Sequence, residues 1–199
     1  MQRFLIFLAA LFPAAALAQT MAPAAAAGNL PSGFYVPSPC IKPDKKAVGT
    51  PALNDPQAAA FYNYKVARFN KAAAVFNVCA KTYLDKSQHD IARIVSMVNT
   101  EAAEARGAAP SPPPAAIANM PADFYPRSPC VKPDQAMIGA QPSTSDHKAM
   151  VAYNFRVAAL NQQTVSFSTC LKTYQDNAQR DIQAIQSATQ AATADGTIP

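Results

Sequence analysis

Residues 62–94 read YNYKVARFNKAAAVFNVCAKTYLDKSQHDIARI, and residues 153–185 repeat that stretch as YNFRVAALNQQTVSFSTCLKTYQDNAQRDIQAI. Fifteen of the 33 aligned positions are identical. Upstream of each copy lies a second matching pair, NLPSGFYVPSPCIKPD at 29–44 and NMPADFYPRSPCVKPD at 119–134, with ten of 16 positions identical. Self-similarity at a fixed spacing indicates a duplicated structural unit, so we predict two tandem repeats.

Each predicted repeat has a proline-rich strap followed by a segment without proline or glycine. The first repeat covers 29–106, with its strap at 29–56 and a helix at 57–105, and the second covers 119–199, with its strap at 119–142 and a helix at 146–193. Proline and glycine are the residues least compatible with a helix interior, so their absence over about 50 residues predicts one long helix per repeat. The expected capping and terminating residues are Asn54, Asp55, Pro56, Ser145, Asp146, Gly107 and Gly196.

An apolar stripe with the 4-3 spacing of a coiled-coil seam runs along both predicted helices. In the first helix its members are Tyr62, Val66, Phe69, Ala73, Phe76, Ala80 and Tyr83, and in the second they are Tyr153, Val157, Leu160, Thr164, Phe167, Leu171 and Tyr174. After Tyr83 and Tyr174 the spacing becomes four, four, three, which is a stutter. A helix with such a stripe is not stable alone. We therefore expect an all-α, coiled-coil-like fold in which the other helix, the strap or a second chain covers the stripe.

The four cysteines, Cys40, Cys79, Cys130 and Cys170, are expected to form two disulfides in an exported chain. We favour Cys40–Cys79 and Cys130–Cys170, because each repeat then closes on itself. The distance is feasible, since Cys79 lies about 35 Å along the helix and the strap can extend roughly 50 Å. The alternative joins equivalent cysteines of the two repeats. Phe34-Tyr35 and Phe124-Tyr125 precede the strap cysteines, and we expect them to close over the stripe.

The N-terminal residues 1–18 have the basic start, short apolar run and Ala-Leu-Ala ending of a cleaved signal peptide. We predict cleavage before Gln19 and Sec-type export, to the bacterial periplasm or beyond the cell. The apolar run is too short to span a bilayer, and no transmembrane segment is expected elsewhere. An alanine-rich leader at 19–28 precedes the first repeat, and a Pro/Ala-rich linker at 107–118 joins the two repeats.

Positive charge is concentrated in the first repeat. Residues 29–106 carry ten basic and six acidic side chains, whereas residues 119–199 carry six of each. The candidate ligand or partner surface comprises Lys42, Lys45, Lys46, Lys65, Arg68 and Lys71. Such a surface attracts an anionic polymer or lipid head groups. The alternative is ordinary solubilising charge, and nucleic acid is not an expected partner in this compartment.

Five asparagines lie beside the stripe: Asn63, Asn70, Asn77, Asn154 and Asn161. Their amides are candidate donors to the carbonyl groups of the strap, and the alternative is that they are solvated.

No motif in the sequence indicates catalysis. The chain has no Cys-x-x-Cys pair and no glycine-rich phosphate loop, and its two histidines, His89 and His147, do not occupy equivalent positions in the repeats. We predict no catalytic residue, cofactor or metal site. The expected function is a non-catalytic structural or interaction protein of the bacterial envelope, acting through helix surfaces by self-association or with an envelope protein. The alternative is a binding module for an anionic envelope ligand through the basic first repeat, with an enzyme as the third choice.

Overall fold

The computed structural model describes residues 27–50, 55–109 and 117–193. The predicted signal peptide, its cleavage site before Gln19 and most of the leader and linker lie outside these residues. No strand occurs in the described part of the chain, where two long α-helices and two short 3-10 helices follow one another. Their bounds are η1 at Lys45–Ala47, α1 at Pro56–Ala105, η2 at Gln135–Ile138 and α2 at His147–Thr193. The predicted all-helical class is confirmed, and both long helices begin within one residue of the predicted positions. None of the helices so described is long and apolar enough to cross a membrane.

The long helices begin and end at residues that satisfy their free backbone groups. The Asp55 carboxylate accepts a hydrogen bond from the Gln57 N–H at 2.9 Å, and proline occupies the first helical position of α1. At the start of α2 the Asp146 carboxylate accepts from the Ala149 N–H, also at 2.9 Å. Gly107 ends α1 with a φ of +77°, a conformation that favours glycine. The predictions for Asp55, Pro56, Asp146 and Gly107 are confirmed, and Asp146 rather than Ser145 caps α2, whereas Asn54 and Gly196 lie outside the described residues.

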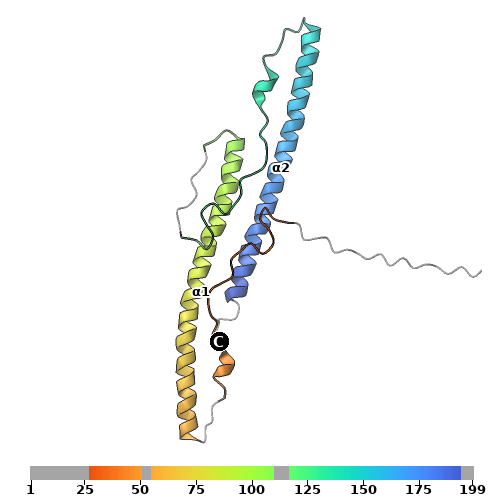
Figure 1. The fold of residues 1–199 in the computed structure, drawn as a ribbon. Helices are drawn as coiled ribbons and strands as arrows, with labels where there is room; N and C mark the ends of the chain where they lie inside the picture. The colour runs from red at the N-terminus through yellow and green to blue at the C-terminus, as the bar shows by residue number, and fades with distance from the viewer. Residues whose placement is uncertain (1–26, 51–54, 110–116, 194–199) are drawn as a thin grey trace, which may run out of the picture.

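Each strap runs back along its own helix and is joined to it by a disulfide (Figure 1). The bonds are Cys40–Cys79 and Cys130–Cys170, each with 5.7 Å between the Cα atoms, as predicted. A short 3-10 helix lies in each strap, and an aspartate caps it, because the carboxylates of Asp44 and Asp134 accept backbone N–H groups two residues further on.

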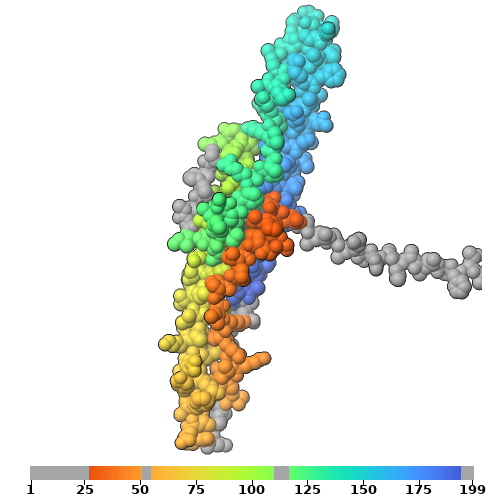
Figure 2. All heavy atoms as spheres, viewed as in Figure 1, coloured from red at the N-terminus to blue at the C-terminus, as the bar shows by residue number. Residues whose placement is uncertain are grey.

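The two long helices lie antiparallel, side by side only over their C-terminal portions (Figure 1). Their N-terminal portions point away from each other, each accompanied by its own strap, so the molecule is elongated (Figure 2). We call the described residues of 36–82 the first arm and residues 126–173 the second arm. The central body between the arms contains the C-terminal portions of α1 and α2 and the starts of both straps.

The core of the central body combines side chains from both helices and both straps. Its buried apolar members are Tyr35, Tyr83, Ile94, Tyr125, Tyr174, Ala178, Ile182 and Ile185. As expected, a tyrosine from each strap closes over the helices. The stripe of each helix therefore has two different covers, namely the opposite helix in the central body and the strap of the same half in the arm.

Candidate functional site

The six predicted cationic residues all lie on the first arm. Lys65 and Arg68, on α1, line a shallow hollow of about 280 Å³ together with Asp44 and Val48 from the strap. Because η1 separates Asp44 from Val48, its residues Lys45 and Lys46 lie beside this hollow. The other two members, Lys42 and Lys71, do not line it and lie in the strap and on an exposed part of α1. The structure thus gathers four of the six residues at one place.

Two of these cations lie over exposed aromatic rings. The Lys65 Nζ atom is 4.7 Å from the centroid of the Phe61 ring, and the Arg68 Cζ atom is 5.9 Å from that of Tyr64. Phe61 is 60% exposed and Tyr64 is 57% exposed. In both pairs the cation follows its ring by four residues, so both members stand on the same side of the helix. Cation–π attraction at this distance holds the cations against the rings at the protein surface.

The exposed residues of α1 form a second stripe, on the side away from the buried one. Its members recur at steps of three and four residues: Phe61, Tyr64, Arg68, Lys71, Val75 and Val78. We call this set the outer stripe. Val75 and Val78 are 66% and 69% exposed, so the outer stripe combines rings, cations and aliphatic side chains along one continuous helix.

Between Lys148 and Lys172, the second arm has an exposed apolar face that carries no charge. Val151, Phe155 and Val165 are 55%, 72% and 67% exposed. The counterpart of Lys65 in the alignment is Arg156, and its Nε atom donates to the Ile138 carbonyl oxygen at 3.0 Å. This basic residue is therefore held against the strap. The sequence analysis singled out the basic arm and did not identify this uncharged face.

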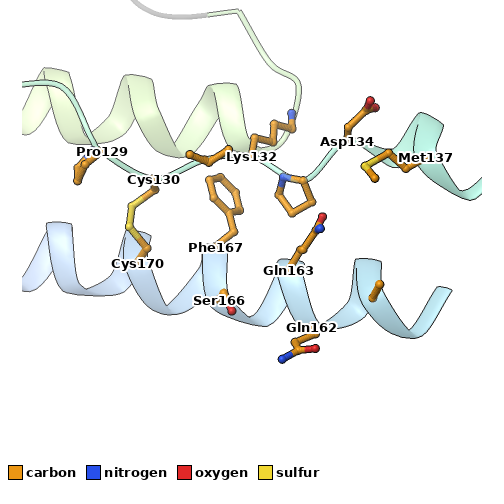
Figure 3. A pocket seen from close by; sticks show the side chains of 13 residues that line it. Pro129, Cys130, Lys132, Asp134, Met137, Gln162, Gln163, Ser166, Phe167 and Cys170 are labelled. Atoms are coloured by element: carbon orange, nitrogen blue, oxygen red, sulfur yellow. A yellow bond between two sulfur atoms is a disulfide. The ribbon is translucent and has the colours of Figure 1, made fainter. Parts of the chain in front are cut away.

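The second arm also contains a hollow of about 740 Å³ between its strap and α2. Figure 3 shows the Phe167 ring pointing from α2 toward the strap, beside the disulfide of Cys130 and Cys170. The cation of Lys132, at the edge of the hollow, donates to the Glu104 carbonyl oxygen at 2.9 Å and so caps the end of α1. Asp134 is the one acidic residue of the lining, and no histidine accompanies it there.

Two buried carboxylates hold the straps where they cross from one helix to the other. Asp90 on α1 is fully buried, and its oxygens accept from the Tyr35 hydroxyl at 2.9 Å and from the backbone N–H groups of Asn119 and Met120 at 3.1 and 3.2 Å. The Asn119 side-chain amide donates to the Tyr35 hydroxyl at 2.8 Å and to the Tyr83 carbonyl oxygen at 3.0 Å. We call this group the first clamp.

A second clamp has the same composition and joins the other strap to α2. Asp181 accepts from the Tyr125 hydroxyl at 3.0 Å and from the Asn29 N–H at 2.9 Å. The Asn29 side-chain amide donates to the Tyr125 hydroxyl at 2.7 Å and to the Tyr174 carbonyl oxygen at 2.9 Å. The sequence analysis did not identify either clamp. The available signal was that the aspartate and the asparagine are each identical between the two copies.

The four clamp tyrosines are kept protonated by their surroundings. Burial is the main cause and raises the pKa of Tyr35, Tyr83, Tyr125 and Tyr174 above the ordinary value of 10.0. The neighbouring Asp90 carboxylate also raises the pKa of Tyr35 and of Tyr83. A neutral tyrosine can donate its proton in a hydrogen bond, as Tyr83 does to the Val36 carbonyl oxygen at 2.7 Å. The clamps therefore contain donors suited to their carboxylate and carbonyl acceptors.

Of the two alternatives for the helix asparagines, hydrogen bonding to the straps and solvation, the structure shows solvation. In the structure the residues in question, Asn63, Asn70, Asn77, Asn154 and Asn161, are exposed, and none of them bonds a strap residue in the part of the chain described. The physical reason is their position, one residue after a stripe member, which turns the side chain about 100° around the helix from it. Asn29 and Asn119, at the start of the straps, make the hydrogen bonds between strap and helix instead.

Within the described ranges, no three or more His, Cys, Asp or Glu side chains are grouped so that they could hold a metal ion. Comparison of the chain with protein-family models, with curated proteins and with solved structures found no match. The arms and clamps described above are therefore the basis for the functional proposal.

Proposed function

We propose that this protein is a non-catalytic structural protein of the bacterial cell envelope that is exported and associates through its helix faces. The signal-like residues 1–18 support export by a Sec-type route. The two disulfides are compatible with that route, because such bonds persist in oxidising compartments. The compartment proposed is the periplasm or the outside of the cell.

The proposal treats the two halves of the chain as tandem repeats. Support comes from the clamps, where residues that match in the sequence make matching contacts. Asn119 bonds Asp90 in one half of the molecule, and Asn29 bonds Asp181 in the other. Each half therefore supplies a carboxylate and receives an asparagine, which is the reciprocal arrangement of a twofold-symmetric interface.

The observation that carries the proposed association is the uncharged outer face of the second arm. Its residues recur at steps of four and three: Val151, Phe155, Ala158, Gln162, Val165 and Thr169. This is coiled-coil spacing, so the face fits a second helix of the same period. A second copy of this chain presents the same uncharged stripe. On the first arm, by contrast, Arg68 and Lys71 would repel an identical helix face. We therefore place self-association on the second arm.

Sedimentation of the oxidised protein over a wide concentration range tests this proposal. We expect an oligomer that persists at high salt, because apolar contacts are not screened by ions. A chain with Phe155→Glu and Val165→Glu should be monomeric. The matched control, Phe61→Glu with Val75→Glu on the first arm, should remain oligomeric. A strict monomer at high concentration, or an oligomer that the second-arm variant leaves intact, would overturn the proposal.

A second candidate function, a binding module for an anionic envelope ligand, is favoured by the cation–ring pairs of the first arm. These pairs hold Lys65 and Arg68 at the surface, in the half that carries the excess positive charge. Binding of the whole chain to immobilised dextran sulfate should be salt-sensitive. It should be lost when Lys65, Arg68 and Lys71 are all changed to Gln. It should be kept when the second half loses the same number of charges through changes at Arg127, Lys148 and Lys172.

A further inference from the structure

We propose that the outer stripe of the first arm docks along the surface of a bilayer that contains anionic phospholipid. This inference rests on the second candidate function and specifies its ligand. It follows from three properties of the stripe. These are its positive charge, its exposed apolar side chains and the strap that covers the opposite side of the helix.

The charge of the outer stripe is complementary to phosphate head groups. Arg68 and Lys71 belong to the stripe, and Lys65 joins it through the Phe61 ring, at 4.7 Å from the ring centroid. No acidic residue occurs in α1 between its start and Asp85. Each basic side chain near an anionic membrane strengthens binding by roughly fivefold, so three of them supply about a hundredfold.

The exposed apolar side chains of the stripe distinguish a bilayer from an anionic polymer. Phe61, Tyr64, Val75 and Val78 are all more than half exposed, and a hydrated polymer offers no apolar phase for them. The boundary between head groups and acyl chains accepts aromatic and aliphatic groups while phosphates contact neighbouring cations. From Phe61 to Val78 the stripe extends about 25 Å along one side of the helix. A straight stripe of this length can lie flat on a bilayer surface.

The first arm can dock without unfolding, because its strap covers the other side of the helix. Ala73 and Phe76 on that side are only 5% and 4% exposed, and the disulfide between Cys40 and Cys79 fixes the strap there. Many amphipathic segments must first become helical at a membrane. Here the helix is already formed, so binding does not carry that ordering cost.

The absence of tryptophan from this chain permits a direct test of insertion. We would place a single tryptophan in the full-length oxidised protein by Phe61→Trp, with Phe155→Trp on the second arm as the matched control. Vesicles of phosphatidylglycerol and phosphatidylcholine should shift the emission of the Phe61→Trp protein to shorter wavelength. Vesicles of phosphatidylcholine alone should not shift it, and the Phe155→Trp protein should not respond to either. No shift with the anionic vesicles would overturn the proposal.

Vesicle sedimentation then separates the two components of binding. Changing Lys65, Arg68 and Lys71 to Gln should weaken binding to anionic vesicles by about a hundredfold. Changing Val75 and Val78 to Ala should weaken it by roughly tenfold while leaving dextran sulfate binding unchanged, because these two exposed side chains insert but pair with no cation. Equal vesicle binding by the Ala variant and the native protein would refute docking through these side chains.

The dextran sulfate experiment distinguishes failure of this inference from failure of the second candidate function. Binding to the polymer without binding to anionic vesicles would overturn the bilayer proposal and leave anionic-ligand binding in place. Binding to neither would overturn both proposals. Circular dichroism of each variant establishes that a loss of binding does not reflect a loss of helix.

Discussion

Replacing Asp90 by alanine should destabilise the whole molecule, because this fully buried carboxylate joins α1 to both straps. Three hydrogen-bond donors lose their acceptor, namely the Tyr35 hydroxyl and the backbone N–H groups of Asn119 and Met120, and the Arg93 guanidinium loses its ion-pair partner at 4.0 Å. Each buried donor left without a partner costs about 1–3 kcal/mol. The two backbone groups are only half-buried and regain some water, so we expect a total loss of about 3–5 kcal/mol in the free energy of unfolding.

Urea unfolding of the oxidised protein, followed by far-ultraviolet circular dichroism, measures this loss. The control is Asp85→Ala on the same helix. The Asp85 carboxylate accepts from the exposed Lys81 ammonium at 2.8 Å, and an exposed pair of this kind contributes at most about 1 kcal/mol. Asp181→Ala should also destabilise the molecule, because Asp181 accepts from the equivalent hydroxyl and backbone donors; the ion pair of Asp90 with Arg93 has no counterpart there, since Ala184 occupies the matching position. A loss for Asp90→Ala no larger than that of the control would refute the assigned role of the clamp.

Three further predictions concern the same central body and the straps. Gly28→Ala should lower the free energy of unfolding by roughly 1–3 kcal/mol in urea, because a Cβ atom at Gly28 would overlap the Asp181 carboxylate. An unchanged free energy of unfolding would contradict that close approach. Changing Cys40 and Cys79 together to serine opens a loop with a sequence separation of 39. The free energy of unfolding should fall by on the order of 4 kcal/mol, which would appear as a lower urea midpoint. An unaltered midpoint would show that the strap is held without the disulfide. At alkaline pH the free energy of unfolding should fall as the pH rises above the ordinary tyrosine pKa of 10.0, because the unfolded chain ionises first when the folded-state pKa is raised. Urea titrations from about pH 9 upward that show no decline would exclude the raised pKa values.

The helices and disulfides were predictable because they depend on local composition and on repetition. Long segments without proline or glycine specify α1 and α2, and the repeated Cys40 and Cys79 motifs indicate pairing within each half. The clamps were not predictable in this way. The contact between Asp90 and Asn119 depends on the path by which each strap crosses to its helix, and no local pattern encodes that path. The sequence left the helix asparagines open between strap bonding and solvation, because their amides suit a strap while their positions on the helix turn them away from it.

On the first arm, the basic character of the surface was predictable, but the pairing of its cations with aromatic rings was not. The sequence identified Lys65 and Arg68 as part of a basic surface. Their aromatic partners became evident only from the structure, because the exposed rings of Phe61 and Tyr64 do not belong to the buried stripe. A second period on the same helix is difficult to recognise when a stronger aromatic period dominates the pattern.

The crossing of the straps also sets the mechanical behaviour of the molecule. The first strap is bonded to α2 through Asn29 and to α1 through Cys40, and the second strap makes the reverse connection. Bending one arm against the other must therefore stretch a strap that is fixed at both ends, so the joint resists hinge motion. Because α1 alone extends about 75 Å and the second arm continues beyond its end, the two tips are more than that distance apart (Figure 1). If the arms bind as proposed, a rod with a stiff joint and a different surface on each arm would hold the two bound partners at a constant separation.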